Sequence, residues 1–230
     1  MAVQQDIESF FKWVADQREE IDKLPNHFSR ILLLSLLDTL ARCARPTEKS
    51  NKNRFVNFID SYSNWVHKDR ISLPQLRYLL SDEPKAIECE QLLREVESRL
   101  SRWGYGKILR PEEADPLSKD LDRFNQGKCE NLIERARYAS LLWTMRNFAV
   151  HEFRDPGQGW SISDDNTSPY YHGHLNSPSK QHSWELYIPC EVISTLVLTC
   201  SEGLKRCFAR ETFNPYDRFN FGSSWFPDQG

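Results

Sequence analysis

The spacing of hydrophobic residues predicts helices over most of the chain. Residues 4–23 carry apolar side chains mostly at helical spacing. Pro25 ends that pattern, and either Asn26 or Ser29 is placed to cap the helix that follows. This second helix, residues 28–45, contains the run RILLLSLLDTLARCA. Because it is apolar on nearly all sides, we expect it to be central in the fold.

The pattern continues with shorter helices after Pro46, which ends the second one. RFVNFIDSYSNWV, residues 54–66, predicts a third helix, and QLRYLL, residues 75–80, predicts a short helical piece. Residues 84–103 place apolar side chains along one face and charges on the opposite face. That arrangement predicts an amphipathic helix packed on a core.

Residues 104–128 interrupt the helical pattern. They are rich in glycine, proline and charge, and we expect a long irregular connection. A long helix is predicted next, over residues 129–153, and the sequence DPG at 155–157 ends it.

The last third of the chain contains the only predicted strands. WSIS at 160–163 and SWELYIP at 183–189 flank a polar loop, so residues 158–189 are expected to form a β-hairpin insertion. A final helix is predicted over 190–210, and residues 211–230 form an aromatic tail without periodicity. The predicted fold is a mainly helical bundle, a single domain over residues 1–230.

Charge and cysteine content bear on the binding partners and the cellular compartment that we expect. The formal net charge is -3, so the chain as a whole has no strong attraction for a polyanion. Residues 42–54 are locally basic and predict either a modest basic patch or a solvated loop. The six cysteines form no CxxC pair and no signal peptide precedes them, so reduced cysteines in a cytoplasmic protein are expected. ILLLSLL, the longest apolar run, is too short to span a bilayer.

Three polar residues stand out in the apolar helix predicted over 129–153. Arg146, Asn147 and His151 lie within two turns of each other, and such residues are costly to bury unless paired. Asn147 and His151 are four apart and share one face, whereas Arg146 leaves the helix roughly 140° from His151. A long arginine side chain, a bend near the helix end, or a second copy of the helix would bring these two together.

A purely structural role for these residues is an alternative. An arginine in a buried helix often pairs with an acid on a neighbouring helix, and Asp38 in LLSLLDTLAR is a candidate. Asp38 is equally placed to pair with Arg42, four residues further along its own helix.

Other candidate sites are weaker. A histidine and cysteine series in the hairpin offers zinc ligands, but its spacing fits no zinc finger, and we expect a plain loop without metal. The series is His172, His174, His182 and Cys190. Tyr170, Tyr171 and Trp184 are suited to stacking on RNA bases or, more simply, to packing within the hairpin. The sequence contains neither a G-x-S-x-G element nor a phosphate-binding glycine loop.

The string R-N-F-A-V-H, residues 146–151, resembles the R-N-x-x-x-H signature of the HEPN superfamily, the helical domains named for higher eukaryotes and prokaryotes nucleotide-binding. SRILLLSLLDTLAR followed by NKNRFVNFI is similar to the preceding helices of HEPN-like proteins. The resemblance covers about residues 28–60 and 129–210. It implies a metal-independent endoribonuclease that needs no cofactor and acts as a homodimer. Such proteins are commonly toxins or effectors, restrained by an antitoxin or another defence-system partner.

The resemblance also implies residue roles. His151 would be the general acid/base, Arg146 the clamp on the scissile phosphate, and Asn147 an orienting residue. Asp38 would be a supporting acid that fixes Arg146 or the His151 tautomer. The basic residues expected to contact RNA are Arg42, Arg54 and Arg137. The alternative is a non-catalytic HEPN-like scaffold that dimerises or binds a partner protein or nucleotide.

Overall fold

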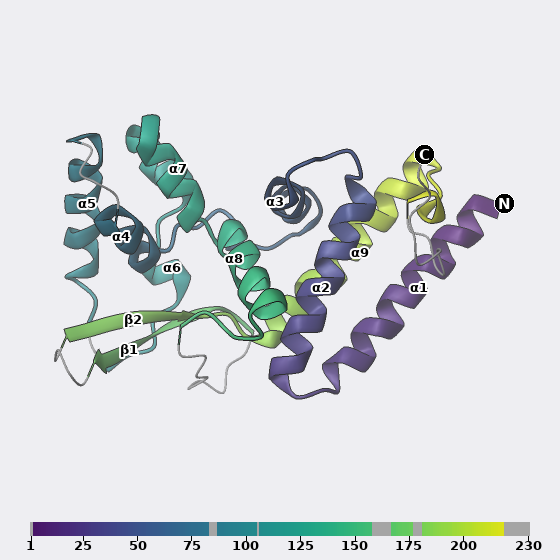
Figure 1. Cartoon of the computed structure of the whole chain (residues 1–230), viewed down its shortest axis with the longest axis horizontal. Helices are drawn as coiled ribbons and strands as arrows, with labels where there is room; N and C mark the ends of the chain where they lie inside the picture. The colour runs from purple at the N-terminus through teal and green to yellow at the C-terminus, as the bar shows by residue number, and fades with distance from the viewer. Residues whose placement is uncertain (1, 83–86, 105, 158–166, 177–180, 219–230) are drawn as a thin grey trace. The chain divides into compact units, whose positions relative to one another are not determined.

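A computed structural model describes residues 2–82, 87–104, 106–157, 167–176 and 181–218. The protein is mainly helical and has a small two-stranded antiparallel sheet, which confirms the predicted fold class at that level (Figure 1). The sequence predicted one domain, and the structure divides into two compact units. Unit 1 comprises residues 1–64 and 194–230, and unit 2 comprises residues 65–193. No helix in the described ranges is long and apolar enough to cross a membrane.

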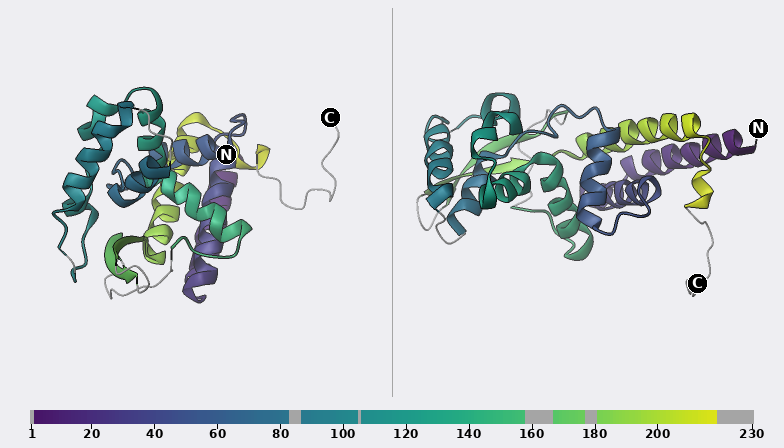
Figure 2. Two further views of the ribbon diagram at one scale, coloured as in Figure 1. Left: turned by 60° about the vertical axis from the view of Figure 1, so that its left-hand side comes forward. Right: turned by 90° about the horizontal axis from the view of Figure 1, so that it is seen from above.

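Unit 1 is built from long helices. Its elements are α1 (Ala2–Asp22), α2 (Asn26–Ala44), α3 (Asn51–Tyr62), most of α9 (Cys190–Glu211) and the 3-10 turn η2 (Pro215–Asp217). Helices α1 and α9 lie side by side in both views of Figure 2. The Phe11 and Phe208 rings, 6.1 Å apart, and an ion pair between Lys205 and Glu8 join them.

Helix α2 forms the centre of the unit 1 core, as predicted. Leu33, Leu34, Leu37 and Leu40 are fully buried, so apolar side chains cover several faces of this helix. The predicted cap is different. α2 begins at Asn26 directly after Pro25. The Ser29 hydroxyl instead donates to the carbonyls of Ile21 and Leu24, at 2.8 and 2.9 Å, and satisfies the end of α1.

Gly203 allows α9 to approach the end of α3. A Cβ atom at this position would lie 2.6 Å from the carbonyl oxygen of Tyr62, which is closer than atoms can pack. The glycine lies inside a helix, where it costs stability relative to alanine. Its use there is explained by the backbone of Tyr62 lying directly against α9.

Unit 2 combines short helices with a hairpin. Its elements are α4 (Leu73–Asp82), α5 (Ile87–Leu100), α6 (Pro111–Ala114), η1 (Ser118–Phe124), α7 (Gly127–Ala136), α8 (Tyr138–His151), β1 (Tyr170–Asn176) and β2 (Gln181–Tyr187). Helices α4, α5 and α7 enclose a common apolar core, to which Leu76, Leu92, Val96 and Leu132 contribute.

The prediction of one long helix over residues 129–153 is wrong, because this segment forms the two helices α7 and α8. Arg137 is extended, with φ −68° and ψ 138°, and separates α7 from α8. At this break the Tyr138 N–H donates to the Arg70 carbonyl and the Ser72 N–H donates to the Ala136 carbonyl, both at 3.0 Å. Bonds to a distant segment replace helical bonds here, and no proline or glycine marks the position in the sequence.

The predicted hairpin loop is wrong, because β1 falls inside it. The first predicted strand, residues 160–163, lies outside the described residues. Strand β1 pairs with β2 in a register from Tyr170↔Tyr187 to Asn176↔Gln181. Tyr170 and Tyr171 are fully buried, and tyrosine favours strands. The flanking serines, prolines and asparagines concealed that tendency.

The segment 104–128 is more ordered than predicted. It contains α6 and η1, and the main chain of Leu109 pairs with that of Tyr171 in both directions. Asp115 within it is buried. In the predicted tail, residues 215–217 form the turn η2, and residues 219–230 lie outside the described residues.

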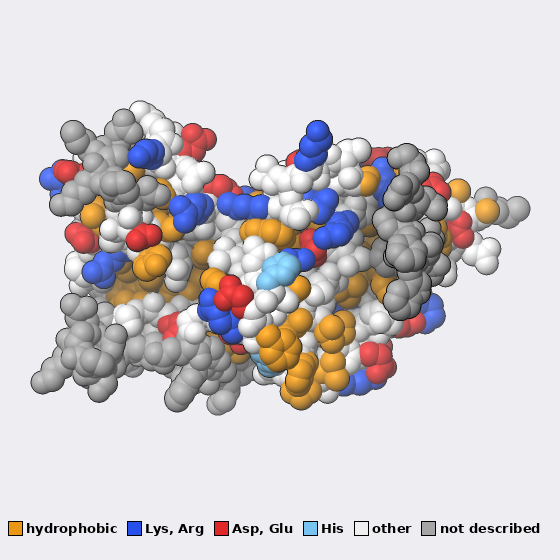
Figure 3. Space-filling view, viewed as in Figure 1, with side chains coloured by type: hydrophobic (Ala, Val, Ile, Leu, Met, Phe, Trp, Pro, Cys, Tyr) orange, Lys and Arg blue, Asp and Glu red, His pale blue; other side chains and the backbone are white. Residues whose placement is uncertain are grey.

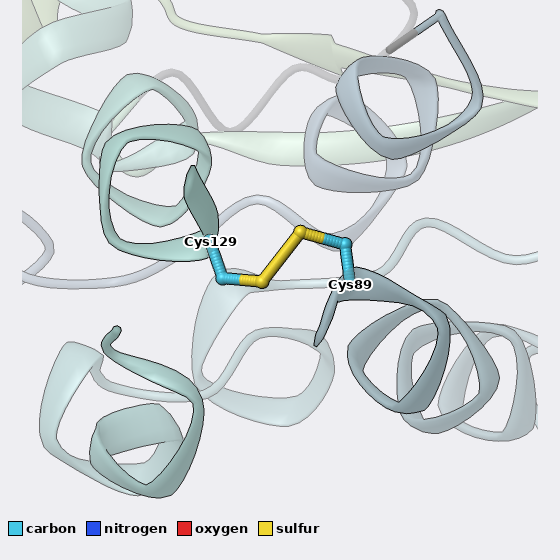
Figure 4. The surroundings of a disulfide bond; sticks show 2 residues. All are labelled: Cys89 and Cys129. Carbon is cyan, nitrogen blue, oxygen red and sulfur yellow. A yellow bond between two sulfur atoms is a disulfide. The ribbon is translucent and has the colours of Figure 1, made fainter. Parts of the chain in front are cut away.

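The expectation of reduced cysteines is wrong for one pair. Cys89 on α5 and Cys129 on α7 form a disulfide, with Cα atoms 5.8 Å apart (Figure 4). The free cysteines Cys43, Cys190 and Cys200 are buried, and Cys207 is partly exposed. The two cysteines are 40 residues apart in sequence. The short spacings that identify metal-binding or redox cysteines do not apply at this separation, so the sequence did not predict the pair.

The disulfide is expected to stabilise unit 2. A bridge closing a loop of 40 residues restricts the unfolded chain, and removing one typically costs about 2–4 kcal/mol. We therefore expect reduction, or the double change Cys89→Ser and Cys129→Ser, to lower the urea midpoint of unit 2. Cys207→Ser, at a free and partly exposed thiol, is the control. Equal midpoints with and without reductant would contradict the expectation.

Candidate functional site

Helix α8 presents the three polar residues at its C-terminal end. Its buried side includes Leu142, Met145 and Ala149. Arg146 is 9% exposed, whereas His151 is the last helical residue and is exposed. The site therefore combines a held guanidinium with an accessible imidazole.

The Arg146 side chain reaches His151 within one chain. Its Nη1 lies 2.8 Å from His151 Nε2 and 3.3 Å from Asn147 Oδ1. The guanidinium carbon also lies 5.2 Å from the centre of the Trp143 ring, a cation–π contact. The long arginine side chain, one of the three possibilities left open by the sequence, thus spans the angle between the two positions. A second chain is not needed to bring these groups together.

This contact indicates which His151 nitrogen acts as the acceptor. A guanidinium has only donors, so a hydrogen bond at 2.8 Å uses the lone pair of Nε2. The tautomer that fits this contact carries its hydrogen on Nδ1. An oxyanion that took over Nη1 of Arg146 would release Nε2 as a free base. The geometry thus links anion binding at Arg146 to the availability of a base at His151.

Asp38, the supporting acid predicted from the sequence, is on helix α2. Asp38 is buried on α2 and pairs with Arg42 at 3.6 Å, the alternative of a bond within its own helix. Because Asp38 belongs to unit 1 and Arg146 to unit 2, its predicted supporting role stays a prediction.

The three arginines expected to contact RNA differ in accessibility. Arg42 has 58% of its side chain exposed. Arg54 is buried and donates to the Glu48 carbonyl at 3.2 Å, which stabilises the start of α3. Arg137 is buried and pairs with Glu134 at 2.8 Å and Asp69 at 3.3 Å, so it holds the break between α7 and α8. Of the three, only Arg42 has the accessibility that a contact with RNA needs.

A buried polar cluster around Asp115 was not predicted. Its Oδ2 accepts hydrogen bonds from the Tyr171 and Tyr138 hydroxyls, at 2.6 and 2.8 Å, and its Oδ1 accepts from the Leu73 N–H at 3.0 Å. Burial raises the pKa of this carboxyl to about 7, although these donors oppose the shift. The cluster is enclosed, which makes it a structural tie and not a site of reaction. Nothing in the surrounding sequence marks Asp115 as buried.

His67 lies in a second polar group of unit 2. Its Nε2 contacts Glu112 at 3.3 Å and the Ser168 hydroxyl at 3.4 Å, and its Nδ1 is buried without a partner among the described residues. Burial lowers the pKa of this imidazole. In a serine relay the acid and the serine must use different ring nitrogens. Both contacts of His67 fall on one nitrogen, so the arrangement is not such a relay.

The hairpin residues also have a structural explanation where they are described. Tyr170 and Tyr171 are fully buried, and Trp184 packs against Trp103 with ring centres 5.2 Å apart, so packing and not base stacking accounts for them. His172 is buried, and the side chains of His174 and His182 lie outside the described residues. Within the described part of the chain, no group of histidines, cysteines and acids is placed to hold a metal.

Comparisons with known proteins add no identification: no protein-family model, curated protein or solved structure matches this chain.

Proposed function

We propose that the protein is a HEPN-like, metal-independent endoribonuclease in which Arg146, Asn147 and His151 act together. The observation that carries the proposal is the 2.8 Å contact between Arg146 Nη1 and His151 Nε2 at the exposed end of α8. It joins an anion-binding group to a neutral imidazole, the two functions that cleavage of RNA without a metal requires.

In the proposed reaction the phosphate of RNA replaces His151 on the Arg146 guanidinium. A free imidazole then takes the proton of the ribose 2′-OH, whose oxygen attacks the adjacent phosphorus. The bond from phosphorus to the 5′ oxygen breaks, and that oxygen takes up a proton. The products are a 2′,3′-cyclic phosphate and a 5′-hydroxyl. Arg146 offsets the negative charge that develops on the phosphate oxygens, and Asn147 orients the guanidinium.

We further propose that the enzyme acts as a cytoplasmic homodimer, as a toxin or an effector of antiviral defence under the control of a partner protein. On the face drawn in Figure 3, basic side chains are interspersed with acidic ones. Because the net charge is also -3, RNA would have to be bound through local contacts or with the help of the partner protein.

A non-catalytic HEPN-like scaffold is the second candidate, and one observation favours it. Arg146 already contacts His151, Asn147 and the Trp143 ring within its own chain, which is sufficient reason for a buried arginine. In that case the three residues would only close the end of α8.

The two candidates are separated by incubating the full chain with mixed cellular RNA in EDTA. The endoribonuclease is expected to produce fragments with 5′-hydroxyl and 2′,3′-cyclic phosphate ends, and to leave 2′-O-methyl RNA and DNA intact. Cleavage that requires a metal, or cleavage of the 2′-blocked RNA, would contradict the mechanism. Absence of cleavage by the folded protein on every RNA tried would favour the scaffold.

A further inference from the structure

A second polar site lies in unit 1, formed by the ends of α2 and α3 and the last turns of α9. It is a pocket with a volume of about 620 Å³, within the usual range for sites that take small ligands. Its lining is made mostly of polar residues and comprises Arg45, Ser61, Tyr62, Asn64, Gly203, Arg206, Cys207, Arg210 and Glu211. The close approach of α9 to Tyr62 at Gly203 brings its two helical walls together.

The pocket has an excess of positive charge. Three arginines face one carboxylate, so the lining carries two more positive than negative charges. Arg210 pairs with Glu211 at 3.1 Å. Arg45 donates to the Ser61 hydroxyl at 2.9 Å through Nη2, and its Nη1 has no partner among the described residues. Arg206 is exposed and has neither an ion pair nor a hydrogen bond to the part of the chain that the structure describes. Two guanidinium groups therefore retain donors for a ligand.

Neutral donors complete the lining. The Tyr62 hydroxyl contacts the Cys207 sulfur at 3.7 Å, a weak bond that a better acceptor can displace. Burial raises the pKa of Tyr62 to about 12, so this hydroxyl stays protonated and able to donate. Ser61 and Asn64 add a hydroxyl and an amide at the end of α3. These groups surround the arginines with hydrogen-bond donors and add no further negative charge.

We propose that this pocket binds a small organic phosphate, with the phosphate monoester held by Arg45 and Arg206 and the organic part in the remaining volume. Guanidinium groups match the oxygens of phosphate in pairs. A monoester carries close to two negative charges at neutral pH, which equals the excess positive charge of the lining. A phosphodiester in RNA carries one, so the charge balance favours the monoester. The proposal stands apart from the endoribonuclease site, because that site lies in the other unit.

The test is calorimetric titration of the full chain at low salt with adenosine 5′-monophosphate, inorganic phosphate and adenosine. We expect the first two to bind and adenosine not to bind. Arg45→Ala and Arg206→Ala should each weaken binding by about 10- to 100-fold, since each removes a charge-assisted hydrogen bond. Arg94→Ala, at an exposed arginine on α5 outside the pocket lining, is the control and should leave the affinity unchanged.

Two further measurements keep the test decisive. Arg206→Lys keeps the charge and should retain more affinity than Arg206→Ala, and circular dichroism verifies that each variant is folded. A short RNA without terminal phosphates should bind the Arg206→Ala variant as well as the wild type. The proposal is overturned by absence of binding to the folded wild type up to about 1 mM adenosine monophosphate. It is also overturned by an equal loss in Arg94→Ala, or by RNA losing affinity in Arg206→Ala while the monophosphate does not.

Discussion

Replacing His151 by alanine is expected to lower the rate of EDTA-resistant RNA cleavage by about 10²- to 10⁴-fold, the usual contribution of a general acid or base. The His151 imidazole is exposed at the end of α8 and its Nε2 lies 2.8 Å from the Arg146 guanidinium, so it is placed to accept a proton there. Since His151 is exposed, its removal should change the free energy of unfolding by no more than about 0.5 kcal/mol. The measurement is single-turnover cleavage of a labelled RNA, with urea unfolding in parallel.

Arg146→Ala is expected to reduce the same rate by a similar factor, because it removes the charge that stabilises the transition state. It should also lower stability, since Arg146 is buried against Trp143 and Asn147. Arg154→Ala is the matched control: Arg154 is an exposed arginine just beyond α8, paired with Glu152 at 2.7 Å. Cleavage equally slowed by Arg154→Ala would assign the effect to general charge. Cleavage unaffected by both His151→Ala and Arg146→Ala would remove the site.

The helices that the sequence predicted well are those whose pattern reflects their burial. The apolar run of α2 and the spacing of apolar residues in α1 and α9 fit a helix and no other secondary structure, so the local sequence is enough to predict these helices. The break at Arg137 shows the opposite case. Its backbone hydrogen bonds go to Arg70 and Ser72, far away in sequence, and the residues on either side are good helix formers.

The candidate site shows the same division. The spacing of Arg146 and His151 identified two residues that the structure brings into contact, but a helical wheel treats side chains as spokes of equal length. It could not show that the Arg146 side chain would extend toward the C-terminal end of the helix and reach Nε2 of His151. The pocket of unit 1 that we propose to bind phosphate could be predicted from the sequence only in part. Arg45 lay in the basic segment 42–54, whereas Arg206 and Arg210 come from a helix that follows about 160 residues later.

Asp115→Ala is expected to lower the stability of unit 2 by about 2–4 kcal/mol. It leaves the buried Leu73 N–H without its acceptor and removes the charged acceptor of the Tyr138 and Tyr171 hydroxyls. The two hydroxyls keep only their 3.2 Å bond to each other and the 2.8 Å bond of Tyr171 to Ser72. The carboxyl joins the end of α6 to α4, α8 and β1, so the loss affects four elements at once. Urea unfolding and amide hydrogen exchange of α8 and β1 measure it. Asp120→Ala is the control, because within the described residues the Asp120 carboxylate accepts only from the Leu117 N–H, in an exposed setting.

The same carboxyl should make stability depend on pH in a defined direction. Its pKa is about 7 in the folded protein against 3.8 for an aspartate in an unfolded chain, so between those values the folded state holds a proton that the unfolded state has released. Stability from this group is therefore full below about pH 4, is lost as pH rises toward 7, and changes no further above that. The shift corresponds to about 4 kcal/mol, from roughly 1.4 kcal/mol per pKa unit.

Asp115→Asn isolates this contribution, because an amide has nearly the same shape and does not titrate. We expect the stability of the wild type to fall more steeply than that of Asp115→Asn between pH 4.5 and 7, and the two curves to run parallel from about pH 8. A steeper fall in the variant, or identical slopes, would mean that the three donors keep the carboxylate ionised despite its burial. The comparison thus decides whether desolvation or hydrogen bonding governs the charge at the centre of unit 2.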